Sequence, residues 1–226
     1  IAGKAMPGSI MVNRIGKRFT NEAQPYEDVV KEQYLSEQRG EKAIPCYLIF
    51  DATYRSKYVI GHIKPSKLES DDNIPSGYFD TGLLTKAETL QQLAEKLAID
   101  KVQLSETVTQ FNANALKGID PDFGRGASLH DRYYADAKVL PNPSLGPIEK
   151  GPFYAFKIEA GDLDTKGGIV CDEFGRVCDG GGEVIEGLYG SGNTTAAVMG
   201  DTYPGAGATI GSAMTFAYIA AHHALD

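Results

Sequence analysis

A glycine-rich loop that begins with a tyrosine could bind a polarised ligand. It lies near the end of the chain and is followed by an apolar stretch. The segment reads Tyr203-Pro204-Gly205-Ala206-Gly207. A tyrosine hydroxyl can donate a hydrogen bond, and a Gly-Ala-Gly loop before a helix leaves backbone N–H groups open to a ligand. The positive end of the helix would favour an anion or an electron-rich ring edge. The alternative is a tight turn before a core helix.

The stretch after this loop predicts one long buried helix. Between Ala208 and Leu225 the only ionisable side chains besides Tyr218 are His222 and His223, and apolar residues recur there at helical spacing. A membrane span is not expected, because the run is only marginally long enough and carries two histidines near its end.

Composition is typical of an ordinary globular protein and argues against several classes of partner. The 226 residues carry a formal net charge of −8, which argues against nucleic acid or an anionic membrane as a main partner. Three cysteines form no C-x-x-C pair, so we expect reduced thiols and a cytoplasmic location. The four histidines do not cluster with them, which argues against a zinc or iron–sulfur site. The chain opens without an initiator methionine, as the middle of a longer protein would.

Periodicity and turn residues predict an α+β fold. We expect strands on both sides of a turn at Gly16 and a helix from Pro25 to about Tyr34. A second pair of helices should begin near Thr85 and Ser105, the latter stopped by Gly118. The predicted strands and hairpin arms are residues 8–22 in two pieces, 45–51, 152–158, 167–172, 175–179 and 184–190. Residues 120–126 resemble a calcium loop only superficially and are expected to form a turn.

Sequence motifs of the common hydrolases and nucleotide-binding loops are lacking. Gly190-x-Gly192 and Gly205-x-Gly207 are fragments of a dinucleotide fingerprint and are weak alone. Tyr26 and Tyr203 each stand next to a proline, and Tyr154 lies two residues after Pro152. Such a hydroxyl can donate to a carbonyl or, with a lowered pKa, take a proton. The alternative for each is packing with a satisfied hydroxyl.

Several motifs together resemble a known family. Gly16–Glu22 followed by Pro25-Tyr26 is similar to the capping-domain signature of flavoproteins of the succinate dehydrogenase/fumarate reductase superfamily. A closer resemblance, nearly end to end and in the same order, is to 3-ketosteroid dehydrogenases. It is carried by Asp120–Gly126, Asp131–Tyr134, Pro141–Gly146, Pro152–Ala155, Thr165–Gly168, Gly187–Tyr189, Gly192-Asn193 and Tyr203–Gly211.

The resemblance implies a substrate-binding α+β capping domain inserted into a Rossmann-like FAD-binding domain. Residues 1–158 would be most of the inserted domain and residues 159–226 the C-terminal part of the FAD domain. Tyr203 and the Gly207 N–H would polarise a 3-keto oxygen, and Tyr26 would belong to the proton-abstracting function while hydride passes to FAD. The residues expected to line the flavin are Gly192, Asn193, Gly207, Ala208, Thr209 and Ile210.

One part of the family pattern has no counterpart in this sequence. The strand–G-x-G-x-x-G–helix that holds the ADP half of FAD is not in the chain. We therefore expect the 226 residues to bind FAD poorly and to be inactive alone, with the missing N-terminal half and a steroid-like small molecule as partners. The implied reaction is Δ1-dehydrogenation. The alternatives are a Δ4-(5α)-dehydrogenase, a fumarate-reductase-like ene-reductase, or a non-catalytic steroid- or lipid-binding module.

Overall fold

The computed structural model describes residues 2–163 and 165–225 and contains helices and strands in both of its parts. Residues 1–160 form one compact unit, the N-terminal unit, and residues 161–226 form a second, the C-terminal unit. The mixed content agrees with the predicted α+β class. Short helices of the N-terminal unit are η1 (Ala2–Ala5), η2 (Asp71–Asn73), α3 (Gly77–Asp80) and α6 (Leu129–Tyr133).

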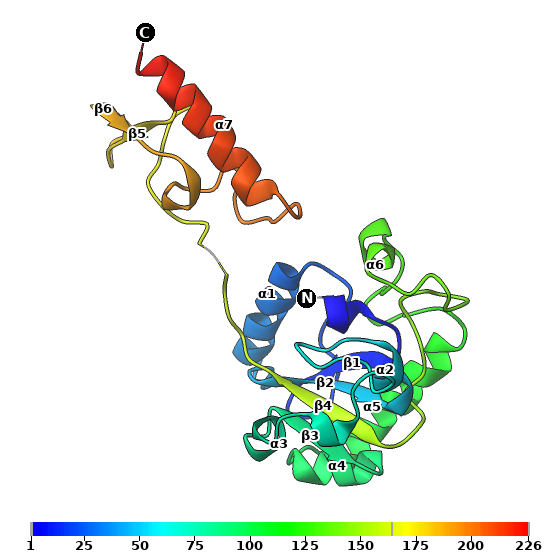
Figure 1. Cartoon of the computed structure of the whole chain (residues 1–226). Coiled ribbons are helices and arrows are strands. Elements are labelled where there is room, and N and C mark those ends of the chain that lie inside the picture. The colour runs from blue at the N-terminus through cyan, green and yellow to red at the C-terminus, as the bar shows by residue number, and fades with distance from the viewer. Residues whose placement is uncertain (1, 164, 226) are drawn as a thin grey trace. The chain divides into compact units, whose positions relative to one another are not determined.

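The N-terminal unit is built on a four-stranded antiparallel sheet (Figure 1). Its strands are β1 (Ser9–Val12), β2 (Cys46–Asp51), β4 (Phe153–Ile158) and β3 (Leu84–Ala87), in that spatial order. Ile49 of β2 lies opposite both Ile10 of β1 and Ala155 of β4. The two apolar runs predicted as strands, residues 45–51 and 152–158, are thus the central pair of the sheet.

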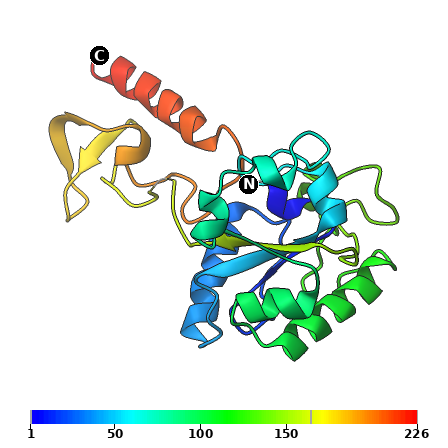
Figure 2. The same ribbon diagram turned by 60° about the horizontal axis from the view of Figure 1, so that its bottom comes forward.

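Neighbouring residues of each strand point to opposite sides of the sheet. Both sides are covered, so each face contributes to a separate buried core. Ile10, Ile49 and Ala155 belong to a core completed by α4 (Leu90–Lys96) and α5 (Lys101–Ala115). These two helices lie side by side on one face of the sheet (Figure 2). The other face forms a second core with residues of α1 (Tyr26–Gln38) and α2 (Ala52–Lys57), among them Met11, Val29, Leu48, Phe50 and Tyr54. The unit therefore has two cores of its own.

Helix boundaries in this unit differ from the sequence prediction at three places. The prediction that a helix begins at Thr85 is wrong, because residues 84–87 form β3 and pair with β4. Helix α4 begins five residues later and is capped by the Thr89 side chain. The helix predicted from Ser105 begins at Lys101, capped by the Asp100 carboxylate. Helix α1 (Tyr26–Gln38) runs one turn beyond the predicted end. Helix α2 (Ala52–Lys57) follows β2 directly.

Two of the predicted strands form isolated β-bridges in the structure instead of regular strands. After the Gly16 turn, only Arg18 pairs with β1, through Val12, because the next residues turn into a buried charged cluster. In the C-terminal unit the turn near Glu173 is confirmed, but its first arm forms only two isolated bridges, Cys171–Val177 and Ile169–Thr195. The regular partner of β5 (Arg176–Cys178) is instead β6 (Val184–Tyr189).

Helix α7 (Ala208–His223) confirms the predicted final helix, but the prediction that it is buried is wrong. Among its described residues only Ala220 is buried, whereas Ile210 is 64% and Met214 67% exposed. Among the described residues of the C-terminal unit, the other regular elements are β5, β6 and η3 (Gly192–Thr194), which leave much of an apolar helix uncovered. In the described part of the chain, no helix has both the length and the apolar character needed to cross a membrane.

Candidate active site

The Tyr203–Gly207 loop has the backbone conformation that its glycines predict. Gly205 has φ +135° and Gly207 has φ +92°, both disfavoured for residues with a side chain. A Cβ built on either glycine would meet no atom within 4 Å, so conformation requires glycine here and open space lies beside the backbone. Tyr203 is half-buried, and the Lys166 ammonium lies 5.8 Å from the centre of its ring. The same ammonium also donates to the carbonyl of Thr202.

The N-terminus of α7 is suited to an electron-rich partner. Gly207 is the N-cap and supplies no side-chain hydrogen bond to the helix. The Ala208 N–H donates to the Gly205 carbonyl at 3.2 Å, and the Gly211 N–H donates to the Gly207 carbonyl at 2.8 Å. The N–H groups of Thr209 and Ile210 stand in the first turn, where a helix offers them no carbonyl, and both residues are exposed. These features fit the flavin edge that the resemblance implies at this helix end.

The second group of predicted cofactor residues packs against the same helix. Gly192 and Asn193 begin η3, and Gly192 adopts φ +78°. The Ser191 hydroxyl donates to the Ala213 carbonyl of α7 at 2.6 Å. A Cβ on Gly192 would lie 3.6 Å from the Ala213 side chain. The structure thus brings the Gly192-Asn193 turn to α7, within the same unit as Tyr203 and Gly207.

Tyr26, the proposed proton acceptor, lies in the N-terminal unit. It is the first residue of α1, is half-buried, and follows Pro25 as the N-cap, whose φ of −49° suits the entry to a helix. Because Tyr26 belongs to one unit and Tyr203 to the other, their joint action on one ligand stays a prediction.

A buried cluster of charges precedes Tyr26, and sequence reasoning missed it. The Arg18 guanidinium donates to Glu22 Oε2 at 2.8 Å and to Asp120 Oδ1 at 2.7 Å. Arg125 donates to the same Glu22 oxygen at 3.1 Å, and the Glu22 and Arg125 side chains are fully buried. The rings of Phe111 and Phe123 lie 5.1 and 5.0 Å from the Arg18 guanidinium carbon. Two separate motifs, at residues 16–22 and 120–126, each carried an arginine and an acid, which was the available signal.

The cluster keeps Glu22 ionised inside the protein. Burial alone would raise the pKa of Glu22, but the guanidinium groups of Arg18 and Arg125 outweigh burial and lower the pKa to about 2. The Met11 N–H also donates to Glu22 at 3.0 Å. Asp120, which begins the stretch resembling a calcium loop, accepts from Arg18 and from the Arg125 N–H. The cluster therefore fixes the segment just before Tyr26 to β1 and to the 120–126 turn.

Acid should weaken the N-terminal unit through this glutamate. The folded pKa of about 2 lies below the ordinary 4.5, so the stabilisation is complete above pH 4.5 and is lost as the pH falls towards 2. A gap of this size corresponds to about 3 kcal/mol. We expect the urea midpoint of the wild-type chain to fall more steeply between pH 5 and 3 than that of Glu22→Gln. Parallel curves for the two proteins would show that Glu22 is not the responsible group.

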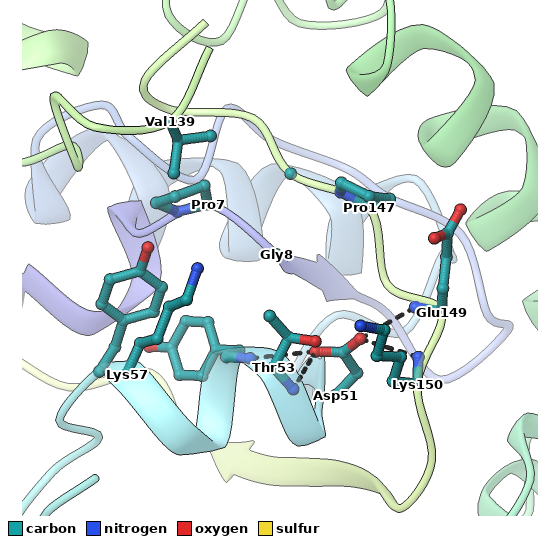
Figure 3. Close-up of a pocket in the computed structure, with 12 residues that line it drawn as sticks. Pro7, Gly8, Asp51, Thr53, Lys57, Val139, Pro147, Glu149 and Lys150 are labelled. Carbon is teal, nitrogen blue, oxygen red and sulfur yellow. Dashed lines mark hydrogen bonds between the residues drawn. The ribbon is translucent and has the colours of Figure 1, made fainter.

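A cavity of about 210 Å³ lies elsewhere in the N-terminal unit (Figure 3). The Asp51 carboxylate on its wall accepts from four backbone N–H groups, which belong to Thr53, Tyr54, Glu149 and Lys150. The Tyr54 hydroxyl donates to the Gly3 carbonyl at 2.6 Å, and that of Tyr58 donates to Asp136 at 2.8 Å. These hydrogen bonds within the protein hold the wall of the cavity together.

Known proteins resemble this chain over nearly its whole length. The chain is 48% identical over 220 residues to a 3-oxosteroid 1-dehydrogenase of Mycolicibacterium smegmatis, covering 95% of this chain and 38% of that protein. It is 42% identical to a 4-oxocyclohexanecarboxylate 2-dehydrogenase of Sinomonas cyclohexanicum, covering 95% of this chain and 36% of that protein. The chain thus spans less than two fifths of the length of these curated relatives.

A solved structure extends the similarity to three dimensions. The 3-ketosteroid Δ1-dehydrogenase of Sterolibacterium denitrificans, solved with 1,4-androstadiene-3,17-dione, superposes with a TM-score of 0.94 at 42% identity. The match covers 99% of this chain and 39% of that one. These similarities confirm the resemblance to 3-ketosteroid dehydrogenases that the motifs indicate. A sequence profile described as the FAD binding domain matches residues 2–210, so the chain belongs to the FAD-binding domain family.

Proposed function

We propose that the protein containing this chain is an FAD-dependent 3-ketosteroid Δ1-dehydrogenase. The observation that carries the proposal is the loop before α7, where the half-buried Tyr203 and the left-handed Gly207 precede an uncapped helix end. In this proposal the phenol and the backbone N–H would donate to one oxygen, as the donors that stabilise a developing oxyanion do. The high identity to named Δ1-dehydrogenases over nearly the whole chain supports the same reaction.

Each unit would then have its own role. We assign the substrate-binding role to the N-terminal unit, which would contribute Tyr26, and the returning part of a Rossmann-like FAD domain to the C-terminal unit. Tyr203 and the Gly207 N–H would bind the ketone oxygen and acidify the C–H bonds of the adjacent carbon. Tyr26 would take the proton. Bound FAD supplies the hydride acceptor.

The substrate class follows from the shared chemistry of the relatives' names. Both the steroid and the cyclohexanecarboxylate relatives are named for dehydrogenation of a ring that carries an oxo group. Two hydrogen-bond donors to a ketone oxygen, as proposed for Tyr203 and the Gly207 N–H, would suit any such ring. The stronger identity to the steroid enzyme, and the steroid in the complex of the S. denitrificans enzyme, favour a 3-ketosteroid as the ligand of this protein.

Anaerobic mixing of the full-length protein with a 3-keto-4-ene steroid tests the proposal. We expect the flavin absorbance to bleach and the product to carry a new C1–C2 double bond. A double bond formed at C4–C5 from a saturated steroid, with no reaction of the 4-ene, would favour a Δ4-(5α)-dehydrogenase instead. Binding of steroid without bleaching would favour the non-catalytic module. The 226-residue chain alone is expected to purify with far less than one flavin per chain.

A further inference from the structure

The ammonium of Lys4 holds the turn that leads into Tyr26. Lys4 belongs to η1, and its side chain reaches across to a segment about twenty residues further along. Its Nζ donates to the Glu22 carbonyl at 2.8 Å and to the Gln24 carbonyl at 2.5 Å. Both contacts are partly buried, so they are stronger than the same contacts would be in water.

The surroundings of this ammonium, taken together, disfavour its charged form. Burial lowers the pKa of Lys4 to about 8, and the nearby Arg125 acts in the same direction. The acids Glu22, Asp131 and Asp28 act in the opposite direction, but do not outweigh burial. Arg125 is turned towards the segment that carries Lys4, since it donates to the Met6 carbonyl at 2.8 Å. A methionine at position 4 would avoid the cost of burying a charge, so the specific contribution of lysine is its two carbonyl contacts.

Those carbonyls belong to a turn that ends at Tyr26. Within the turn, the Gln24 N–H donates to the Asn21 carbonyl at 3.2 Å. The Asn21 amide is in turn anchored to Asp131 Oδ2 at 3.0 Å. Pro25, the next residue, has no N–H and gives α1 no side-chain cap. The contacts made to residues 21–24 therefore help to set the direction in which the chain enters α1, and with it the place of Tyr26.

We propose that Lys4 is a positioning residue for Tyr26, acting through the Glu22 and Gln24 carbonyls. The inference rests on the proposed function, in which Tyr26 takes a proton from the substrate. A small displacement of a catalytic group is enough to lower a rate by as much as about 10²-fold. Removal of the Lys4 ammonium should thus act on the chemical step and not on flavin binding.

A double-mutant cycle in the full-length flavoprotein tests this coupling. Lys4→Met is expected to lower the rate of flavin reduction by about 10–100-fold, with the steroid KM and flavin content nearly unchanged. In a Tyr26→Phe background the same substitution should cost less than about threefold, because the group that it positions is already gone. Lys4→Arg, which keeps a cation and its donors, should recover part of the rate. Lys31→Met, on the next turn of α1, is the matched control and should change little.

Hydrogen exchange supplies a readout that does not depend on turnover. Lys4→Met should speed amide exchange in residues 21–26 by about tenfold or more, and Lys31→Met should not. Equal costs of Lys4→Met in the wild-type and Tyr26→Phe backgrounds, or unchanged exchange, would overturn the positioning role. If no ring ketone reduced the flavin of the wild-type protein, the proposed function would be overturned. The exchange result would still decide whether Lys4 holds the turn. Should Lys4→Met not fold, Lys4→Gln takes its place in both measurements.

Discussion

Tyr203→Phe in the full-length protein is expected to slow flavin reduction by the steroid by about 10²–10³-fold, the usual cost of losing one oxyanion donor. The variant removes only the hydroxyl, because a phenyl ring keeps the contact made by Lys166 at 5.8 Å. The Gly207 N–H would remain as the second donor, so activity should fall without vanishing. Stopped-flow measurement of flavin bleaching gives the rate, and the flavin-to-protein absorbance ratio gives the cofactor content.

Tyr218→Phe is the matched control for this substitution. Tyr218 lies on α7 ten residues after Ala208, nearly three turns from the helix end that carries the proposed donors, so its hydroxyl should be dispensable for both flavin binding and reduction. Loss of flavin from Tyr203→Phe, at an unchanged rate per remaining flavin, would assign Tyr203 to cofactor binding. A rate within about twofold of wild type would remove the phenol from the proposed mechanism altogether.

Arg18→Met is expected to destabilise the N-terminal unit by about 3–5 kcal/mol, because it leaves two buried carboxylates without a shared cation. The side chains of Glu22 and Asp120, which Arg18 joins, are both almost fully buried. Methionine would still pack between the two phenylalanine rings, so the loss reports on charge rather than on volume. For a protein of this size, the expected fall in Tm is roughly 10 °C.

Arg14→Met offers the comparison on the other side of the Gly16 turn. Its side chain is 43% exposed and lies 3.9 Å from Glu37, a pair expected to contribute less than about 1 kcal/mol. Thermal unfolding of both variants at neutral pH makes the measurement. If Arg18→Met lowered Tm no more than Arg14→Met, the buried cluster would not be a main source of stability.

The parts of the fold predicted well from sequence are those that a local pattern determines. The apolar run at residues 45–51 could hardly be anything but a buried strand, and it is the second strand of the sheet. The stretch at residues 84–87 gave no such signal. Thr85 and Glu88 look like a helix start, but Thr85 lies opposite Ala155 in the sheet. A partner seventy residues away decided the structure, and no local preference reveals such a partner.

The site was predicted unevenly for a similar reason. Gly207 stands out in sequence because a glycine before an apolar helix is a helix boundary signal, and its left-handed conformation confirms that reading. The contacts of Lys4 and Arg125 could not be predicted, since they join residues up to 121 positions apart through backbone carbonyls. Carbonyl acceptors occur at every residue, so sequence carries no mark of which ones a buried cation will choose.

The different exposure of the two units has a consequence for biosynthesis. Residues 2–160 enclose both of their cores with their own side chains, so this unit can fold as soon as it has left the ribosome. The C-terminal unit cannot do the same, because α7 keeps apolar side chains such as Met214 in water. Until a partner surface covers them, nascent chains carrying this helix should be the species that chaperones retain.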